Sequence, residues 1–332
     1  MEPKAWGLGL ANFFIASSHT VKTQQARCLP RSFWDSGEEC LISSKEMLDI
    51  RTIYDRTIYD GTGAPPSPCL TKVLHEAYDG ELCFSDASNR PLIVGNFVQT
   101  LDGIVSLRIP GKSGGAEISG RNEEDAFIMG LLRAYADAVM FGEDTFRNAP
   151  GHAWTADFVY PIFEKEFQAF RKQIGKGSLH PVNVVVSGRG HVDLDQPLFR
   201  REEIRSPVLT TEQGAARLHE RYGTSLSAAV HVLPGDTVLN PSDMASLLHA
   251  DYGVKLLLHE GGPTLFSSFL GQSLVDELFL TVAPQIVGRG RTGERPAFSG
   301  PLGLAPEQAM WSTLLSVKRA AKSGHLFLRY RL

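Results

Sequence analysis

The sequence predicts an α/β protein in which a mainly parallel sheet lies between two layers of helices. Short apolar runs rich in β-branched residues alternate with longer amphipathic segments throughout residues 90–332. Most of these runs show no polar alternation, which indicates strands buried on both faces, as in parallel sheets. The last two runs flank a Ser-Gly turn and predict an antiparallel hairpin at the C-terminus.

Composition places the chain among ordinary globular proteins and disfavours several classes. Its 332 residues carry 33 Lys plus Arg and 37 Asp plus Glu, for a net charge of −4. This mild acidity disfavours a dedicated nucleic-acid binder. No apolar run approaches the roughly 20 residues that span a bilayer. Asn12 interrupts the stretch from Trp6 to Ala16 that most resembles a signal peptide. We therefore expect a cytoplasmic protein with no membrane or nucleic-acid partner.

The four cysteines all lie in the first quarter of the chain, at Cys28, Cys40, Cys69 and Cys83. None forms a C-x-x-C pair, and their clustering does not resemble a disulfide scaffold, so we expect a reducing compartment. The zinc deaminase signature, H-x-E followed by P-C-x-x-C, is absent from residues 1–89. The ten histidines show no metal-ligand spacing. We expect neither a metal site nor deaminase chemistry.

Residues 1–89 differ in pattern from the rest of the chain. They contain a duplicated pentapeptide, Arg51–Asp55 followed by Arg56–Asp60. A repeat this short cannot build a solenoid, and a hairpin or a sequence slip explains it better. A short helix is expected near Thr71–Tyr78. We interpret residues 1–89 as a partly irregular arm or cap on a main domain formed by residues 90–332.

The first elements of the main domain follow from apolar periodicity and turn residues. Pro91–Val98 is an apolar run bounded by turn residues and predicts a buried strand. Asn122 and Asp125 give an N-cap pattern that opens a helix over Asn122–Ala136. Three further elements follow in order: a buried strand at Asp137–Phe141, an amphipathic helix at Asp157–Ile174 and a β-branched strand at Val182–Val186.

The second half of the domain continues the alternation of strands and helices, and glycines directly after two of the helices mark their ends. The expected elements are a strand at Pro207–Thr210, a helix at Glu212–Tyr222, a strand at Ala228–Leu233, a helix at Ser242–Tyr252, a strand at Lys255–His259, a helix at Thr264–Gly271, a strand at Glu277–Ala283, and hairpin strands at Thr313–Arg319 and His325–Arg331.

Three strand-to-helix turns carry residues suited to ligand binding, which in open α/β sheets occurs at the carboxyl ends of strands. The first has Gly142 after a strand and Thr145 in the next helical turn. The second is Gly261-Gly262-Pro263-Thr264, where glycines admit a ligand close to the backbone and free helix amides attract phosphate. The third presents Ser187 and Arg189, which suit an adenosine 2′-phosphate.

In their order along the chain, these motifs resemble the dihydrofolate reductase superfamily. They resemble more closely one branch, the reductase domain of the bifunctional riboflavin-biosynthesis deaminase–reductase and its stand-alone relatives. The resemblance implies a three-layer α/β/α fold with a mainly parallel sheet and a C-terminal antiparallel hairpin. It spans about residues 90–332 and rests on Thr100-Leu101-Asp102-Gly103, Ile118-Ser119, Leu131-Leu132-Arg133-Ala134, Met140–Phe146, Glu260–Leu265 and Leu274–Leu278.

The resemblance implies an NADPH-dependent reductase that acts on 5-amino-6-(5-phosphoribosylamino)uracil and turns its ribosyl group into a ribityl chain. By matching position, Thr100, Asp102, Arg133 and Glu260 are expected to face the substrate. No side chain is singled out as catalytic, because the cofactor carries the chemistry. The family also pairs as homodimers. The residues expected to hold NADPH are Gly142, Thr145, Arg147, Ser187, Arg189, Gly261, Gly262, Pro263, Thr264, Leu265, Phe266, Ser267 and Ser268.

Three of the four substrate-side residues also have a purely structural interpretation. Arg133 fits a helix-surface ion pair, Glu260 a charge partner for a helix N-terminus, and Asp102 a turn residue. The glycines fit ordinary turns, and Arg189 fits a solvated loop charge.

The chain departs from the family pattern on the substrate side. Ile104 replaces a Lys or Arg, Glu117 replaces a Trp, and no Arg follows Arg147 until Arg171. A phosphate-bearing substrate favours bidentate cationic donors. Two alternatives therefore stay open: a reductase of another pteridine- or pyrimidine-like substrate, and a nucleotide-binding protein without turnover.

Overall fold

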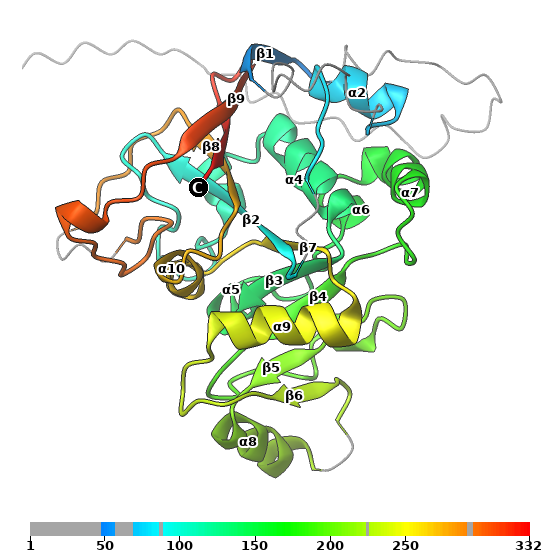
Figure 1. Cartoon of the computed structure of the whole chain (residues 1–332), viewed down its shortest axis with the longest axis vertical. Helices are drawn as coiled ribbons and strands as arrows, with labels where there is room; N and C mark the ends of the chain where they lie inside the picture. The colour runs from blue at the N-terminus through cyan, green and yellow to red at the C-terminus, as the bar shows by residue number, and fades with distance from the viewer. Residues whose placement is uncertain (1–47, 57–68, 86–88, 224–225, 291–294) are drawn as a thin grey trace, which may run out of the picture. The chain divides into compact units, whose positions relative to one another are not determined.

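The computed structural model describes residues 48–56, 69–85, 89–223, 226–290 and 295–332. Their strands form one ten-stranded sheet (Figure 1). Seven neighbouring strands are parallel, in the order β8 (Glu277–Ala283), β2 (Leu92–Thr100), β7 (Leu256–His259), β3 (Ala138–Gly142), β4 (Val182–Val186), β5 (Val208–Thr210) and β6 (Val230–Val232). Beyond β8 the sheet continues with the antiparallel strands β10 (Leu326–Arg331), β9 (Thr313–Ala320) and β1 (Ile50–Asp55).

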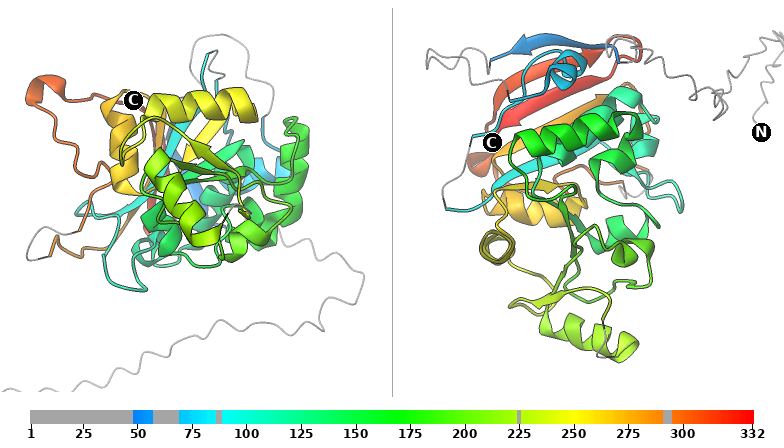
Figure 2. Two further views of the ribbon diagram at one scale, coloured as in Figure 1. Left: turned by 90° about the horizontal axis from the view of Figure 1, so that it is seen from below. Right: turned by 90° about the vertical axis from the view of Figure 1, so that its right-hand side faces the viewer.

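Helices cover both faces of this sheet, as Figure 2 shows. Each face has its own apolar cluster, because the parallel strands are buried on both sides. One cluster takes side chains from α4 (Glu123–Tyr135), α5 (Glu143–Arg147), α7 (Glu164–Gln173) and α8 (Glu212–Tyr222), and the other from α9 (Pro241–Tyr252) and α10 (Pro263–Gly271). The expected α/β architecture, with its mainly parallel sheet and C-terminal hairpin, is confirmed.

The expected continuous helix at Asp157–Ile174 is wrong. The structure divides it into α6 (Ala156–Val159), a 3-10 turn at Pro161–Phe163, and α7. Pro161 lacks an amide proton and disfavours helical geometry at the residue before it. Tyr160 accordingly has φ −140° and ψ 75°. Pro161 therefore interrupts a pattern that is otherwise amphipathic.

The other expected elements appear with boundaries shifted by a few residues. The Asn122 side chain caps α4 by accepting from the Asp125 amide at 2.8 Å. Gly223 and Gly253 end their helices as expected. The strand expected at Ala228–Leu233 shrinks to the three residues of β6, which lies at the edge of the sheet. A short helix, α3 (Gly115–Ser119), was not predicted.

The described part of the arm joins the main domain directly. β1 pairs with β9, and the Thr71 hydroxyl caps α2 (Lys72–Tyr78) at the expected place. Residues 1–47 and the second pentapeptide copy beyond Arg56 lie outside the described residues. No helix in the described ranges is both long and apolar enough to cross a membrane.

Cys69 and Cys83 form a disulfide, with their Cα atoms 5.8 Å apart. The sequence did not predict this bond between two thiols 14 residues apart, which lie on either side of α2. Disulfides are uncommon in reducing compartments, so this pair counts against the compartment expected from the cysteine pattern.

Lys318 in β9 is a buried cation beneath the arm, with 1% of its surface exposed. Its ammonium donates to the Thr52 hydroxyl at 2.7 Å and to the Asp79 carbonyl at 3.0 Å. It also lies 4.1 Å from the centre of the Tyr78 ring. Burial lowers the pKa of Lys318 from 10.5 to about 8, and the charges of Asp55 and Asp79 oppose that shift.

We expect Lys318 to make the protein more stable as the pH rises from about 8 to 10.5. In this range the unfolded chain binds more protons at this position than the folded chain, so the free energy of unfolding increases with pH. Lys318→Met should remove that increase, whereas Lys322→Met, at an exposed lysine, should keep it. Urea unfolding at several pH values between about 8 and 10.5 measures the difference. An unchanged slope in Lys318→Met would contradict the assignment.

Candidate active site

The turns after β7, β3 and β4 meet at one edge of the sheet, because these three strands are neighbours. The Gly142 amide donates to the Gly261 carbonyl at 3.1 Å, and the Glu260 amide donates to the Met140 carbonyl at 3.0 Å. Gly142 also pairs in register with Val186, the last residue of β4. The structure thus joins the three predicted turns at the edge where open α/β sheets bind ligands.

Four of the predicted residues, Gly142, Thr145, Gly261 and Gly262, form what we call the glycine cradle. A Cβ added at Gly262 would meet only the Thr145 hydroxyl, at 3.4 Å, whereas Gly261 has a φ of +116° that disfavours any side chain. The Gly261–Gly262 peptide bond is cis. Gly262 is also the N-cap of α10 and has no side chain to bond the first helix amides. Those amides therefore suit an anion.

The rest of the predicted cofactor stretch is used partly inside the protein. Leu265 packs near Gly142, with its Cβ 3.9 Å from a Cβ built on that glycine. The Ser267 and Ser268 hydroxyls each donate at 2.7 Å to carbonyls of α10 itself. Phe266 is fully buried, with its ring 4.7 Å from the ring of Phe97. The Phe266 side chain therefore lies in the core, and only its backbone is left for the expected cofactor contact.

Arg133 and Glu260 form a buried ion pair. Arg133 Nη2 lies 2.7 Å from Glu260 Oε2, and Arg133 Nε lies 3.1 Å from both carboxylate oxygens. Their side chains are only 2% and 6% exposed. The surface ion pair considered for Arg133 is therefore wrong, and Glu260 pairs with a side chain rather than with a helix end. The pair stands beside the glycine cradle because Gly261 directly follows Glu260.

His152 completes this cluster. Its Nε2 lies 3.3 Å from both terminal nitrogens of Arg133, which also donates to the Thr155 carbonyl at 3.2 Å. A guanidinium can only donate, so His152 Nε2 accepts and the imidazole carries its proton on Nδ1. Burial, followed by the Arg133 charge, lowers the pKa of His152 to about 3. The imidazole is therefore neutral, and its Nδ1–H can donate.

Asp102 ties two loops together at the end of β2. The Thr100 hydroxyl donates to its carboxylate at 2.5 Å, and the Gly288 amide donates at 2.6 Å. The Thr100 hydroxyl bond, supported by the amides of Gly288 and Val287, lowers the pKa of Asp102. These contacts support the interpretation of Asp102 as a turn residue. Thr100 is fully buried and also accepts from the Ile104 amide at 3.0 Å.

In the third predicted turn, the Arg189 side chain is accessible to a ligand, whereas the Ser187 hydroxyl is already bonded within the protein. The Ser187 hydroxyl donates to the Glu143 carboxylate, and Ser187 is 2% exposed. Arg189 is exposed, and its guanidinium makes no hydrogen bond or ion pair with another described residue. Arg147 is paired with Asp144 and lies 3.9 Å from Glu143. Of these cations, Arg189 alone keeps an unpaired guanidinium.

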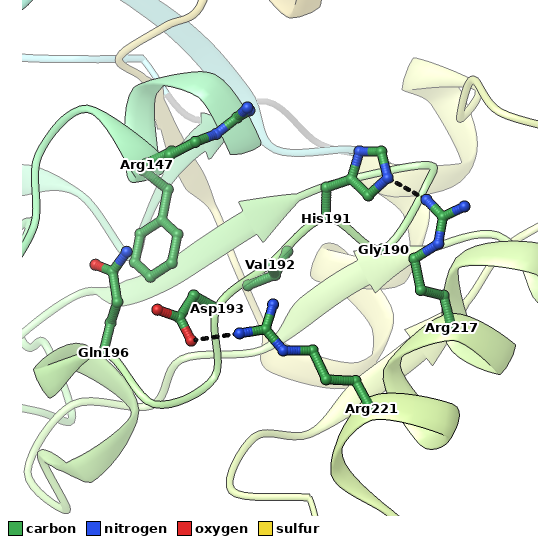
Figure 3. Close-up of a pocket in the computed structure, with 9 residues that line it drawn as sticks. Arg147, Gly190, His191, Val192, Asp193, Gln196, Arg217 and Arg221 are labelled. Carbon is green, nitrogen blue, oxygen red and sulfur yellow. Dashed lines mark hydrogen bonds and ion pairs between the residues drawn. The ribbon is translucent and has the colours of Figure 1, made fainter. Parts of the chain in front are cut away.

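A hollow of about 510 Å³ opens next to this turn, between α5 and α8 (Figure 3). Arg217 and Arg221 of α8 point into it, the first toward His191 and the second toward Asp193, 3.5 Å away. Arg189 does not line this hollow. The residues that line it are Phe146, Arg147, Gly190, His191, Val192, Asp193, Gln196, Arg217 and Arg221.

Sequence reasoning missed three residues of this edge: Glu143, His152 and His259. Glu143 and His259 adjoin the predicted glycine turns, so their neighbours in sequence could have indicated them. His259 is fully buried, burial lowers its pKa to about 3, and its Nδ1 accepts from the Gly261 amide at 3.3 Å. Nothing in the spacing of His152 indicated a place beside Arg133.

Comparisons with known proteins identify the family. The family model of the RibD C-terminal domain matches residues 91–304. A reductase of 2,5-diamino-6-ribosylamino-4(3H)-pyrimidinone 5′-phosphate from Archaeoglobus fulgidus is 29% identical over 199 residues, which cover 60% of this chain and 83% of the relative. Its namesake from Methanothermobacter thermautotrophicus is 31% identical over 60% of this chain and 80% of its own.

Solved structures share the fold. A pyrimidine reductase-like protein from Corynebacterium diphtheriae superposes with a TM-score of 0.55 at 24% identity, covering 73% of this chain and 92% of that one. RibD from Acinetobacter baumannii superposes with a TM-score of 0.52 at 19% identity, covering 78% and 60%. The match to the family model covers more than half of the chain and includes the glycine cradle, Arg133 and Glu260. The chain therefore belongs to the RibD C-terminal domain family.

Proposed function

We propose that this protein is an NADPH-dependent reductase that acts on a ribosylamino-pyrimidine phosphate and converts its ribosyl group into a ribityl chain. The observation that carries the proposal is the meeting, at one sheet edge, of the glycine cradle, the uncapped start of α10 and the Arg133–Glu260 pair. The names of the relatives, which are reductases of such a pyrimidinone phosphate, support the same substrate class.

The residues at this edge fit a dinucleotide. The glycine cradle leaves backbone free for close approach, and the first amides of α10 suit a pyrophosphate. The Thr145 hydroxyl borders the same space, and the unpaired Arg189 suits a 2′-phosphate. When bound there, the nicotinamide supplies the hydride. Leu265 packs against the buried apolar cluster on its face of the sheet, and these side chains exclude water from that side of the site.

Arg133, Glu260 and His152 are positioned to orient the substrate. The Arg133 donors all face Glu260, His152 and backbone carbonyls, so Arg133 acts by fixing those two neighbours. Glu260 accepts from Arg133 Nε and Nη2 and also, at 3.5 Å, from Asn96 Nδ2. A substrate N–H would therefore take the place of the long bond from Asn96. The neutral His152 offers one N–H to a substrate oxygen. Together they provide one acceptor and one donor with no net charge.

A second candidate substrate class is favoured by Ile104. At this position the family usually carries a cation, but here the side chain is apolar and fully buried. Glu117, at the family's Trp position, is instead paired on the surface with Arg121 at 3.0 Å. These two positions therefore provide no donor for a substrate phosphate. A pteridine- or pyrimidine-like substrate without that phosphate is the alternative reductase function.

The test is NADPH oxidation by the purified full chain with a panel of substrates. The panel holds the diamino-pyrimidinone phosphate named for the relatives, its deaminated form, their dephosphorylated ribosides, and several pterins and quinazolines. Turnover of a phosphorylated pyrimidine supports the proposal, and turnover of only the other compounds supports the alternative. NADPH binding without turnover of any compound would identify a nucleotide-binding protein instead. Zinc content and ammonia release test the expected absence of deaminase activity.

We expect Arg189→Ala to weaken NADPH binding about 10- to 100-fold and to leave NADH binding nearly unchanged. A charge-assisted hydrogen bond to the 2′-phosphate is worth about 1.5–3 kcal/mol, and NADH lacks that phosphate. Fluorescence titration with both cofactors measures the effect. Arg200→Ala, at another exposed arginine, is the control, and Arg147→Ala tests the other predicted donor. Equal losses for both cofactors would contradict the contact.

We also propose that the protein is a homodimer acting in the cytoplasm. The dimer follows from the family resemblance, and light scattering at micromolar concentration should return about twice the 36.4 kDa of one chain. The Cys69–Cys83 disulfide opposes the cytoplasmic assignment. Cells can be lysed in the presence of an alkylating reagent and the alkylated cysteines of the protein counted. Alkylation of both Cys69 and Cys83 would support the cytoplasm, and an intact disulfide would contradict it.

A further inference from the structure

A carboxylate, that of Glu143, lies beside the Ser187 hydroxyl, which the sequence predicts to bind phosphate. Glu143 is the first residue of α5 and follows Gly142 of the glycine cradle. Ser187 follows Val186, which pairs in register with Gly142, so the two side chains leave adjacent strands at the same level. The Ser187 hydroxyl donates to Glu143 Oε2. The Glu143 side chain keeps 24% of its surface exposed, so a ligand can reach it.

The hydroxyl of Ser187 has no proton left for a ligand. It carries one hydrogen, which it gives to Glu143, and its oxygen accepts from the His191 amide at 2.9 Å. An ionised phosphate needs donors, and Ser187 offers none while Glu143 is in place. The other carboxylate oxygen lies 3.8 Å from His191 Nδ1 and 3.9 Å from Arg147. These partial contacts orient Glu143 without neutralising it by a close ion pair.

We propose that Glu143 limits the preference for NADPH over NADH that Arg189 provides. Its carboxylate accepts a hydrogen bond from the 2′-hydroxyl of the adenosine ribose in NADH and repels the 2′-phosphate of NADPH. An acidic side chain that binds the ribose hydroxyl is the general means by which dinucleotide sites select NADH. Like charges placed side by side at an interface repel each other and weaken binding. This inference rests on the proposed cofactor function and adds to it a residue that opposes Arg189.

Asp144, the next residue of the same helix, provides a matched control. It carries the same charge as Glu143, but its side chain is 80% exposed and pairs with Arg147 rather than with Ser187. Replacing either carboxylate by its amide changes the net charge of the protein by the same amount. Only Glu143→Gln removes charge from the contact with Ser187, so the comparison separates a local effect from a long-range one.

The experiment is calorimetric titration of the full chain with two fragments that differ by one phosphate, adenosine 2′,5′-bisphosphate and 5′-AMP. Glu143→Gln should tighten the bisphosphate at least about tenfold, because like-charge repulsion is removed. It should change 5′-AMP by less than about threefold, since a glutamine still accepts from a 2′-hydroxyl. Glu143→Ala should tighten the bisphosphate as well and should weaken 5′-AMP.

The outcomes separate this inference from the proposed function. Asp144→Asn should leave both affinities at parental values. If it tightened the bisphosphate as much as Glu143→Gln does, the effect of Glu143 would be one of net charge and not of its contact with Ser187. Unchanged or weaker bisphosphate binding in both Glu143 variants, each with a parental melting temperature, would overturn the inference. A parent protein that binds neither fragment and neither intact dinucleotide would instead overturn the proposed cofactor function.

Discussion

Gly262→Val is expected to abolish NADPH binding while the protein stays folded. The valine side chain would occupy the space between the Thr145 hydroxyl and the start of α10, where the backbone must lie close to the pyrophosphate. The fold should tolerate the change, because Gly262 has φ −73° and ψ 170°, which any residue can adopt. Its added Cβ meets only Thr145 Oγ1, at 3.4 Å.

Two other glycines make this result interpretable. A Cβ at Gly95 would lie 2.6 Å from the Phe266 ring, so Gly95→Ala should lower the melting temperature by disturbing the core. A Cβ at Gly303 meets nothing within 4 Å, so Gly303→Val should change neither stability nor affinity. Melting curves and NADPH titrations on all three variants provide the comparison. A folded Gly262→Val protein with parental NADPH affinity would remove the glycine cradle from the cofactor site.

The fold could be predicted from the sequence because its elements are local patterns. The β-branched run at Val182–Val186 and the N-cap at Asn122 each depend on a few consecutive residues, and both appear where expected. The prediction of a single helix at Asp157–Ile174 was wrong, because the apolar periodicity continues across Pro161 although the missing amide of that proline interrupts the helix. For the first pentapeptide copy the sequence left a hairpin or a sequence slip open. It could not indicate strand β1 there, because that strand is defined by its pairing with β9, about 265 residues away.

The candidate site was only half predictable for the same reason. Gly142 and Gly261 could be recognised because each glycine directly follows a predicted strand, where a ligand can approach the backbone. Pairs of side chains that meet only in the folded protein could not be recognised from the spacing of residues in the sequence. Arg133 and Glu260 are 127 residues apart and were assigned separately to a substrate, although they bind each other. Ser187 was assigned to a phosphate because Glu143, 44 residues earlier, was not known to take its proton.

Arg133→Leu is expected to destabilise the protein by about 3–5 kcal/mol, because it leaves the Glu260 carboxylate buried without its counter-charge. The loss should be visible in urea unfolding. The double variant Arg133→Leu with Glu260→Leu should recover part of it, since both buried charges are then absent. The exposed pair of Arg121 and Glu117 is the control, and Arg121→Leu should cost less than about 1 kcal/mol.

Two further variants, Glu260→Gln and Arg133→Lys, decide whether Arg133 acts on the substrate directly or through its neighbours. If Arg133 only positions Glu260 and His152, Glu260→Gln should raise KM for the pyrimidine substrate and leave NADPH affinity unchanged, because the amide keeps one acceptor but alters the geometry.

Arg133→Lys should keep a charge beside Glu260 and restore part of the stability that Arg133→Leu loses. It cannot reproduce the fork that reaches both Glu260 and His152. We therefore expect Arg133→Lys to recover stability more fully than kcat/KM. Equal recovery of both would show that a single charge, rather than the positions of Glu260 and His152, is what the reaction requires from Arg133.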